Sequence, residues 1–122
     1  MANYSFDFNK IERRYFYVTL KDYFFEKNGK KIEKKGEQLI VKMPTKRTFN
    51  KITAMQNIDT DKMSADDAFD TMADLMAEIL SNNMTRKNIS AKIISENYEL
   101  EEMSDFINSY IDFVKGATKD PN

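Results

Sequence analysis

The side chains in this sequence that could carry out acid–base or metal chemistry are almost all carboxylates. The chain has 122 residues, with 20 Asp and Glu, no His and no Cys. It therefore has no imidazole base, no thiol nucleophile and neither of the commonest zinc ligands. Its three glycines, Gly29, Gly36 and Gly116, lie too far apart to form a phosphate-binding loop. We expect a protein that is not an enzyme and that holds no metal or other cofactor.

A second set of candidate residues is apolar and lies at helical spacing near the C-terminus, in "NYELEEMSDFINSYIDFVKGA", residues 97–117. Such a stripe usually packs in a core, but a stripe rich in aromatic residues and Met can also fit a partner's groove. Phe106 lies near the centre of the stripe and Phe113 at its margin. We expect Phe106 to serve folding, and Phe113 and Tyr110 to serve both folding and binding. The predicted partner-binding residues, on this helix and on residues 65–82, are Met103, Phe106, Tyr110, Phe113, Phe69, Met72 and Met76.

The elements that must position these residues begin with strands. Aromatic and β-branched residues are dense from residue 13, and Asn28-Gly29 is a strong hairpin signal, because a type I′ turn needs positive φ at both central residues. Gly36 predicts a second tight turn. The pattern predicts a three-stranded antiparallel meander over about 13–26, 30–35 and 38–43. The middle strand, "KKIEKK", is either a lysine-protected edge or the tip of a long hairpin.

Helical periodicity follows the strands. Thr45, Ser64 and Ser90 are typical N-cap residues, and apolar residues recur with a period near 3.6 behind them. We therefore predict the α+β class, with a small N-terminal β-meander followed by three to four helices that pack on it. We expect an N-terminal segment at 1–12, one domain at 13–116 and a disordered tail at 117–122. The predicted helices span about 45–57, 65–82, 90–95 and 99–115.

Charge is unevenly distributed along the chain. Residues 1–58 carry 13 Lys and Arg against 6 Asp and Glu, and residues 59–122 carry 6 against 14, so the halves are +7 and −8. This asymmetry has three interpretations: two solvated faces, a basic half that binds nucleic acid, or head-to-tail attraction between copies in a homo-oligomer, which salt would weaken. No recognised nucleic-acid-binding motif is present, and Lys outnumbers Arg ten to three in the basic half, which argues against nucleic acid.

Targeting signals are also missing from the sequence. No apolar run approaches the roughly 18 residues that a membrane span requires. The first residues have no cationic head followed by an apolar stretch, as a secretory signal would. We expect a cytoplasmic protein that does not contact a membrane.

Three short motifs resemble a known family. They are "EILSNN" at 78–83, the acidic "YELEEM" at 98–103 and "FINSYIDFVKG" at 106–116. With the order of elements, they resemble the small tail assembly chaperones of long-tailed, siphovirus-like phages and prophages of Gram-positive bacteria. The resemblance covers roughly residues 13–116 in layout and 65–116 in residue detail. It carries no catalytic residue.

The resemblance implies a function and partners. Such chaperones bind the tape measure protein in the host bacterial cytoplasm before the tail tube polymerises around it, and they are absent from the mature virion. A frameshifted longer form of the chaperone is thought to recruit the tail tube protein. Two alternatives are a structural tail component, such as a completion or connector protein, and a small nucleic-acid-binding phage protein that uses the basic N-terminal half.

Overall fold

Residues 16–41 fold as one long, interrupted β-hairpin in a computed structural model that describes residues 3–56 and 62–116. At the tip, β2 (Tyr23–Lys27) pairs with β3 (Lys30–Lys34). Asn28 and Gly29 join them with φ of 55° and 76°, as the predicted type I′ turn requires. At the base, β1 (Phe16–Thr19) pairs with β4 (Gln38–Val41), so the strands form two two-stranded antiparallel sheets.

The pairing of β4 corrects the expected meander. β4 lies beside β1, with Val18 opposite Leu39, and it does not pair with β3. The physical reason is burial: β4 contributes buried Leu39 and Val41, whereas every residue of β3 is exposed. An apolar strand gains more from an apolar partner against the helices than from a charged one in solvent.

Gly36 therefore does not turn the chain into a third strand. It lies where the two strands of the hairpin approach each other between the two sheets. Its N–H donates to Asp22 Oδ1 over 2.6 Å, and Leu20 N–H donates to the Glu37 carbonyl over 2.9 Å. A Cβ at position 36 would overlap the carbonyl oxygen of Leu20, so the glycine permits this close approach.

The helices confirm the α+β class. Each begins and ends within one or two residues of its predicted span. Ser64 and Ser90 act as N-caps: their side chains accept hydrogen bonds from the N–H groups of Asp67 and Ile93. The helices are α1 (Lys46–Gln56), α2 (Ala65–Ser81), α3 (Ala91–Asn97) and α4 (Leu100–Gly116).

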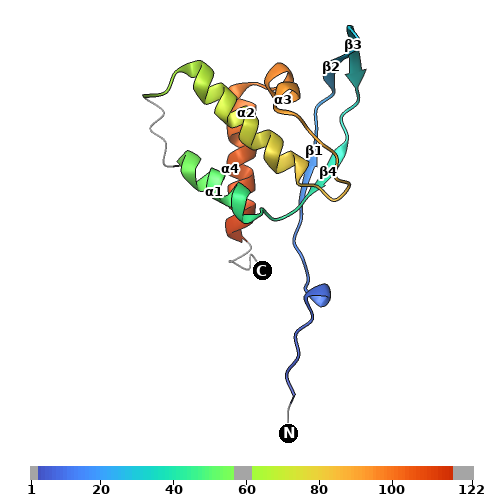
Figure 1. Cartoon of the computed structure of the whole chain (residues 1–122), viewed down its shortest axis with the longest axis vertical. Coiled ribbons are helices and arrows are strands. Elements are labelled where there is room, and N and C mark those ends of the chain that lie inside the picture. Colours follow the sequence, from blue (N-terminus) through green and yellow to red (C-terminus); the bar gives the residue numbers. More distant parts are fainter. Residues whose placement is uncertain (1–2, 57–61, 117–122) are drawn as a thin grey trace.

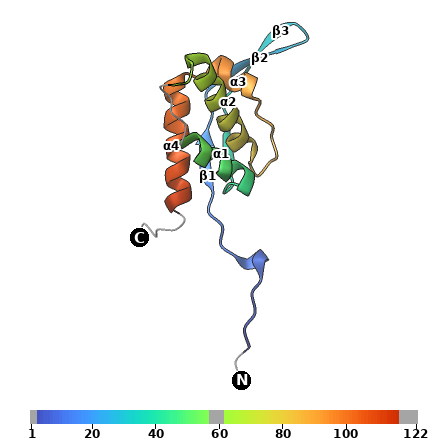
Figure 2. The ribbon, with the colours of Figure 1, turned by 60° about the vertical axis from the view of Figure 1, so that its left-hand side comes forward.

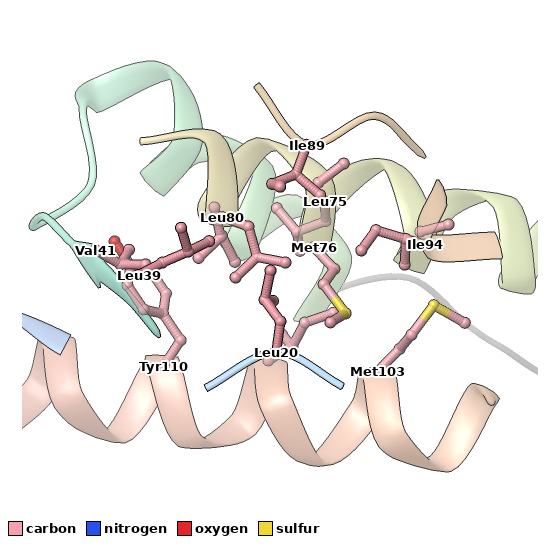
Figure 3. Packing of buried hydrophobic residues seen from close by; sticks show 14 of the residues in the cluster. Leu20, Leu39, Val41, Leu75, Met76, Leu80, Ile89, Ile94, Met103 and Tyr110 are labelled. Carbon is pink, nitrogen blue, oxygen red and sulfur yellow. The ribbon is translucent and has the colours of Figure 1, made fainter. Parts of the chain in front are cut away.

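Helix α2 occupies the centre of the fold, in contact with α1, α3, α4 and β4. The β1–β4 sheet and the helices enclose the core, which Figure 3 shows from close by. Leu20, Leu39 and Val41 come from the strand region, and Met76 and Leu80 from α2. Ile94 of α3 and Met103 and Tyr110 of α4 complete the cluster.

The β2–β3 hairpin projects beyond this core (Figures 1 and 2). The lysine-rich strand is thus a hairpin tip and not the edge of a larger sheet. Asn97 at the end of α3 fixes the hairpin to the body, since its side chain accepts from the Phe24 N–H and donates to the Phe24 carbonyl, each over 2.9 Å. This paired contact helps to orient the hairpin, which is also anchored by Tyr23, buried in the core, and by Phe25, packed against it.

Candidate functional site

An apolar groove between α1, α2 and α4 is the candidate binding site for a protein partner. Its volume is about 300 Å³. Helix α1 supplies Ile52 and Met55, α2 supplies Met72, and α4 supplies Ile107 and Ile111. The remaining lining residues are Gln56, Met63, Ala68, Thr71, Ser104 and Asn108.

The lining of the groove suits apolar side chains of varied shape. Three of its residues, Met55, Met63 and Met72, have flexible thioether side chains that adapt to irregular ligands. The polar residues that line it, such as Thr71 and Asn108, are uncharged. None of the described residues that line the groove titrates, so the groove can bind a side chain but offers no acid or base for catalysis.

The seven predicted partner-binding residues do not form one surface. Met76, Met103 and Tyr110 are buried in the core, with exposed fractions of 2%, 0% and 0%. Phe69, Phe106 and Phe113 are partly buried against the core. Met72 is the one member of the set that lines the groove. Tyr110, which we expected to serve both folding and binding, has no exposed surface in this conformation and so offers no surface to a partner there.

Phe16 of β1 explains why α4 is so aromatic. Its ring centroid lies 5.6 Å from that of Tyr110, 6.0 Å from that of Phe106 and 5.3 Å from that of Phe113. The Arg14 guanidinium lies over the Phe113 ring, 5.6 Å from its centroid. Ring pairs at these separations are mutually attractive. The aromatic stripe is thus a seam between β1 and α4, and Phe106 and Phe113 both belong to it.

Tyr110 is the fully buried residue of this seam. Its hydroxyl donates to the Lys42 carbonyl over 2.8 Å, which satisfies a phenol that has no exposed surface. Burial raises the pKa of Tyr110 far above the ordinary value for a phenol, because the phenolate would lose its hydration. The residue therefore has a structural role in this conformation.

The raised pKa of Tyr110 predicts a loss of stability in alkali. In the unfolded chain the phenol ionises near pH 10, whereas in the folded chain it stays neutral. The stability that the neutral, buried phenol contributes to the folded state is therefore complete below about pH 10 and is lost as the pH rises above it. We expect the urea midpoint to fall between about pH 9 and pH 11, and to fall less in Tyr110→Phe, because phenylalanine has no proton to lose. Every other ionisable group is the same in both proteins, so equal losses would contradict the assignment.

Sequence reasoning assigned no role to the N-terminal segment, and the structure gives it one of the most exposed apolar surfaces of the described chain. Tyr4 is 95% exposed, and Phe6 and Phe8 are each 70% exposed. We call residues 3–11 the aromatic arm; it leads away from the helices in both views (Figures 1 and 2). The signal was present as the alternation of aromatic and polar residues in "YSFDF".

The basic and acidic residues behind the charge asymmetry are exposed on different elements of the structure. Lysines of the β2–β3 hairpin are exposed, including Lys30, Lys31 and Lys34. Aspartates, among them Asp66 and Asp70, are exposed on α2. Across residues 3–56 and 62–116 no group of His, Cys, Asp and Glu could hold a metal ion, and no helix is long and apolar enough to cross a membrane.

Comparison with protein-family models, curated proteins and solved structures finds no match to this chain.

Proposed function

We propose that this chain is a phage tail assembly chaperone that binds the tape measure protein and keeps it soluble during tail morphogenesis in the host cytoplasm. The observation that carries the proposal is the Met-lined groove between α1, α2 and α4. Two of these helices contain motifs of the resemblance: "EILSNN" ends α2, and "FINSYIDFVKG" supplies Ile107, Asn108 and Ile111 of the groove. The proposed partners include further copies of the chain, a frameshifted longer form and the tail tube protein.

The chemistry of the groove supports a holding role. A tape measure protein is a long helical chain whose apolar stripes aggregate when they are left uncovered. A helix of this kind places anchor side chains at i, i+3 and i+4, which a groove between helices can accept. Flexible methionines allow many similar segments to bind without a strict sequence requirement. Holding requires no catalytic group.

Co-expression with a tape measure fragment tests the proposal. We expect wild-type chain to keep an amphipathic fragment of the tape measure protein soluble, and Asn108→Arg to weaken binding at least tenfold, about 1.4 kcal/mol. Asn108 is exposed on α4 and lines the groove, so a long charged side chain there obstructs it with little effect on folding. Pull-down titrations and thermal melts measure binding and folding.

Ser109→Arg is the matched control, because Ser109 is the next residue on α4, is also exposed and does not line the groove. Equal binding by the two arginine variants would contradict the groove as the binding site. A fragment that stays insoluble with wild-type chain would contradict the chaperone function. Mass spectrometry of purified virions is a separate check: an abundant signal from this chain would favour a structural tail component.

A further inference from the structure

We infer that the aromatic arm of one copy of this chain binds in the α1–α2–α4 groove of a second copy. The starting observation is that the aromatic part of the arm makes no hydrogen bond or ring contact to the helices or strands of the described chain, whereas Ile11 at its end lies near Met43 and Met84. The hydrogen bonds of Asp7, Asn9, Lys10 and Arg13 all close within residues 7–13. The rings of Phe6 and Phe8 contact each other edge to face at 4.8 Å, and both stay 70% exposed.

The pattern of the arm suits insertion into an apolar hollow. Phe8 begins a short 3₁₀ helix, η1 (Phe8–Lys10), and Asp7 before it is extended, so the side chains of Phe6 and Phe8 point to one side and that of Asp7 to the other. Contiguous exposed apolar surface of this kind marks an interaction site. An arm with one apolar side can bind in a groove and keep its polar side in water.

The groove matches this ligand in size and in chemistry. A volume of about 300 Å³ is at the lower end for ligand pockets, which suits one or two aromatic rings. The apolar side chains that line it, Ile52, Met55, Met72, Ile107 and Ile111, provide contacts for a ring on several sides. Sulfur–aromatic contacts add to the attraction between the methionines and a phenylalanine.

Charge complementarity favours the same pairing. The apolar part of the arm is followed by Lys10 and Arg13, with Glu12 between them, so residues 9–13 carry a net charge of +1. On α4, Asp105 and Asp112 are three residues before and four residues after the groove residue Asn108, so they share its side of the helix. Both aspartates are exposed, and neither forms an ion pair within the described residues.

The two surfaces of this contact are different, so it is head to tail. In both views the arm runs away from the helices that form the groove, which favours the groove of another copy (Figures 1 and 2). A head-to-tail contact repeats into an open chain or a ring of copies. The arm would occupy the same groove that we propose for the client, so a client would have to displace it. That competition rests on the proposed function, but the contact itself can be tested without any client.

Cysteine cross-linking tests the contact, because the chain has no native Cys. Purified Ser5→Cys and Asn108→Cys chains, with tags of different mass, are mixed and treated with a short bismaleimide. We expect at least ten times more mixed dimer than from Ser5→Cys with Lys31→Cys, whose cysteine lies on the exposed hairpin. Equal yields would overturn the inference.

The same reagents distinguish the other arrangements. A predominance of Ser5→Cys homodimers would mean that arms pair with arms. A predominantly intramolecular link in the doubly substituted chain at high dilution would mean that the arm binds its own groove. Either result overturns the inference and leaves the proposed chaperone function standing.

Sedimentation measures the same contact in solution. Phe6→Ser with Phe8→Ser should weaken self-association at least tenfold and leave the thermal melt unchanged, since both rings lie outside the core. Tyr17→Ser is the matched control, because Tyr17 is an exposed aromatic residue on β1, 61% accessible and outside the arm. Unchanged self-association in the arm variant, or an equal loss in Tyr17→Ser, would overturn the inference. Neither measurement involves the client. A failure of the chain to bind the client would therefore contradict only the proposed function.

Discussion

Replacing Tyr110 with alanine is expected to destabilise the protein by about 3–5 kcal/mol, the usual cost of removing a large buried aromatic ring. The ring has no exposed surface and contacts Phe16 and Phe113, with centroids 5.6 and 5.8 Å away. Its hydroxyl also bonds to the Lys42 carbonyl. A loss of this size is a large share of the stability of a small domain. Urea unfolding at neutral pH measures it.

Two further variants separate the parts of this effect. Tyr110→Phe keeps the ring and removes only the hydrogen bond to Lys42, so it should cost about 0.5–1.5 kcal/mol. Phe49→Ala removes an aromatic ring that is 48% exposed on α1 and should cost much less. If Tyr110→Ala cost no more than Phe49→Ala, the seam between β1 and α4 would not be the element that holds α4 in place.

Replacing Asn83 with aspartate is expected to cost about 3–5 kcal/mol, although the two side chains have nearly the same shape. Asn83 is 2% exposed. Its Nδ2 donates to the carbonyls of Leu80 and Lys87, each over 2.8 Å. Its Oδ1 accepts from Thr85 N and Oγ1 and from Lys87 N at 3.1, 3.0 and 3.0 Å. A carboxylate cannot donate, so it would face two carbonyl oxygens as a buried charge.

The loss in Asn83→Asp should depend on pH. Burial beside carbonyl groups would raise the pKa of the new carboxyl group above its unfolded value. The variant should therefore regain stability as pH falls towards about 4, and lose it as pH rises. Asn88→Asp is the control, because Asn88 is exposed in the same loop. Equal stability of the two variants at neutral pH would contradict the structural role of Asn83.

Asn83 also shows what part of the family-like motif "EILSNN" does here. Ile79 and Leu80 are fully buried, and the Asn82 side chain donates to the Met43 carbonyl over 3.0 Å. The backbone of this segment pairs with β4, where Lys42 N donates to the Asn82 carbonyl and Met84 N to the Ile40 carbonyl. The motif ends α2 and fastens the following loop to the sheet. Its residues act through folding, and the groove lies elsewhere on α2.

The sequence by itself determined the features that depend on near neighbours along the chain. Ser64 and Ser90 cap helices whose N–H groups lie three residues away, and Asn28 and Gly29 form a turn within four residues. The α+β class follows from the spacing of apolar residues, which recur with a period of two in the strands and with a period of 3.6 in the helices. The chemistry that the composition excludes, that of His and Cys, is likewise readable from the sequence alone.

The candidate site could be predicted only in part. Met72 was identified because it lies on the apolar face of a predicted helix, but that face is wider than the groove and includes the buried Met76. The aromatic arm was visible as an alternating pattern in "YSFDF". The sequence did not predict that the arm is exposed to solvent, because a segment with alternating apolar and polar residues can equally lie in a sheet.

Tertiary structure alone decided which apolar residues meet. Periodicity places Tyr110, Phe106 and Phe113 on one side of α4, but only the position of Phe16, more than 90 residues away, makes Tyr110 the buried centre. The pairing of β4 with β1 is decided in the same way, by burial against the helices and not by the nearest turn. Hydrophobic burial is non-directional and acts between any surfaces that the folded chain brings together, so a local pattern does not specify its partner.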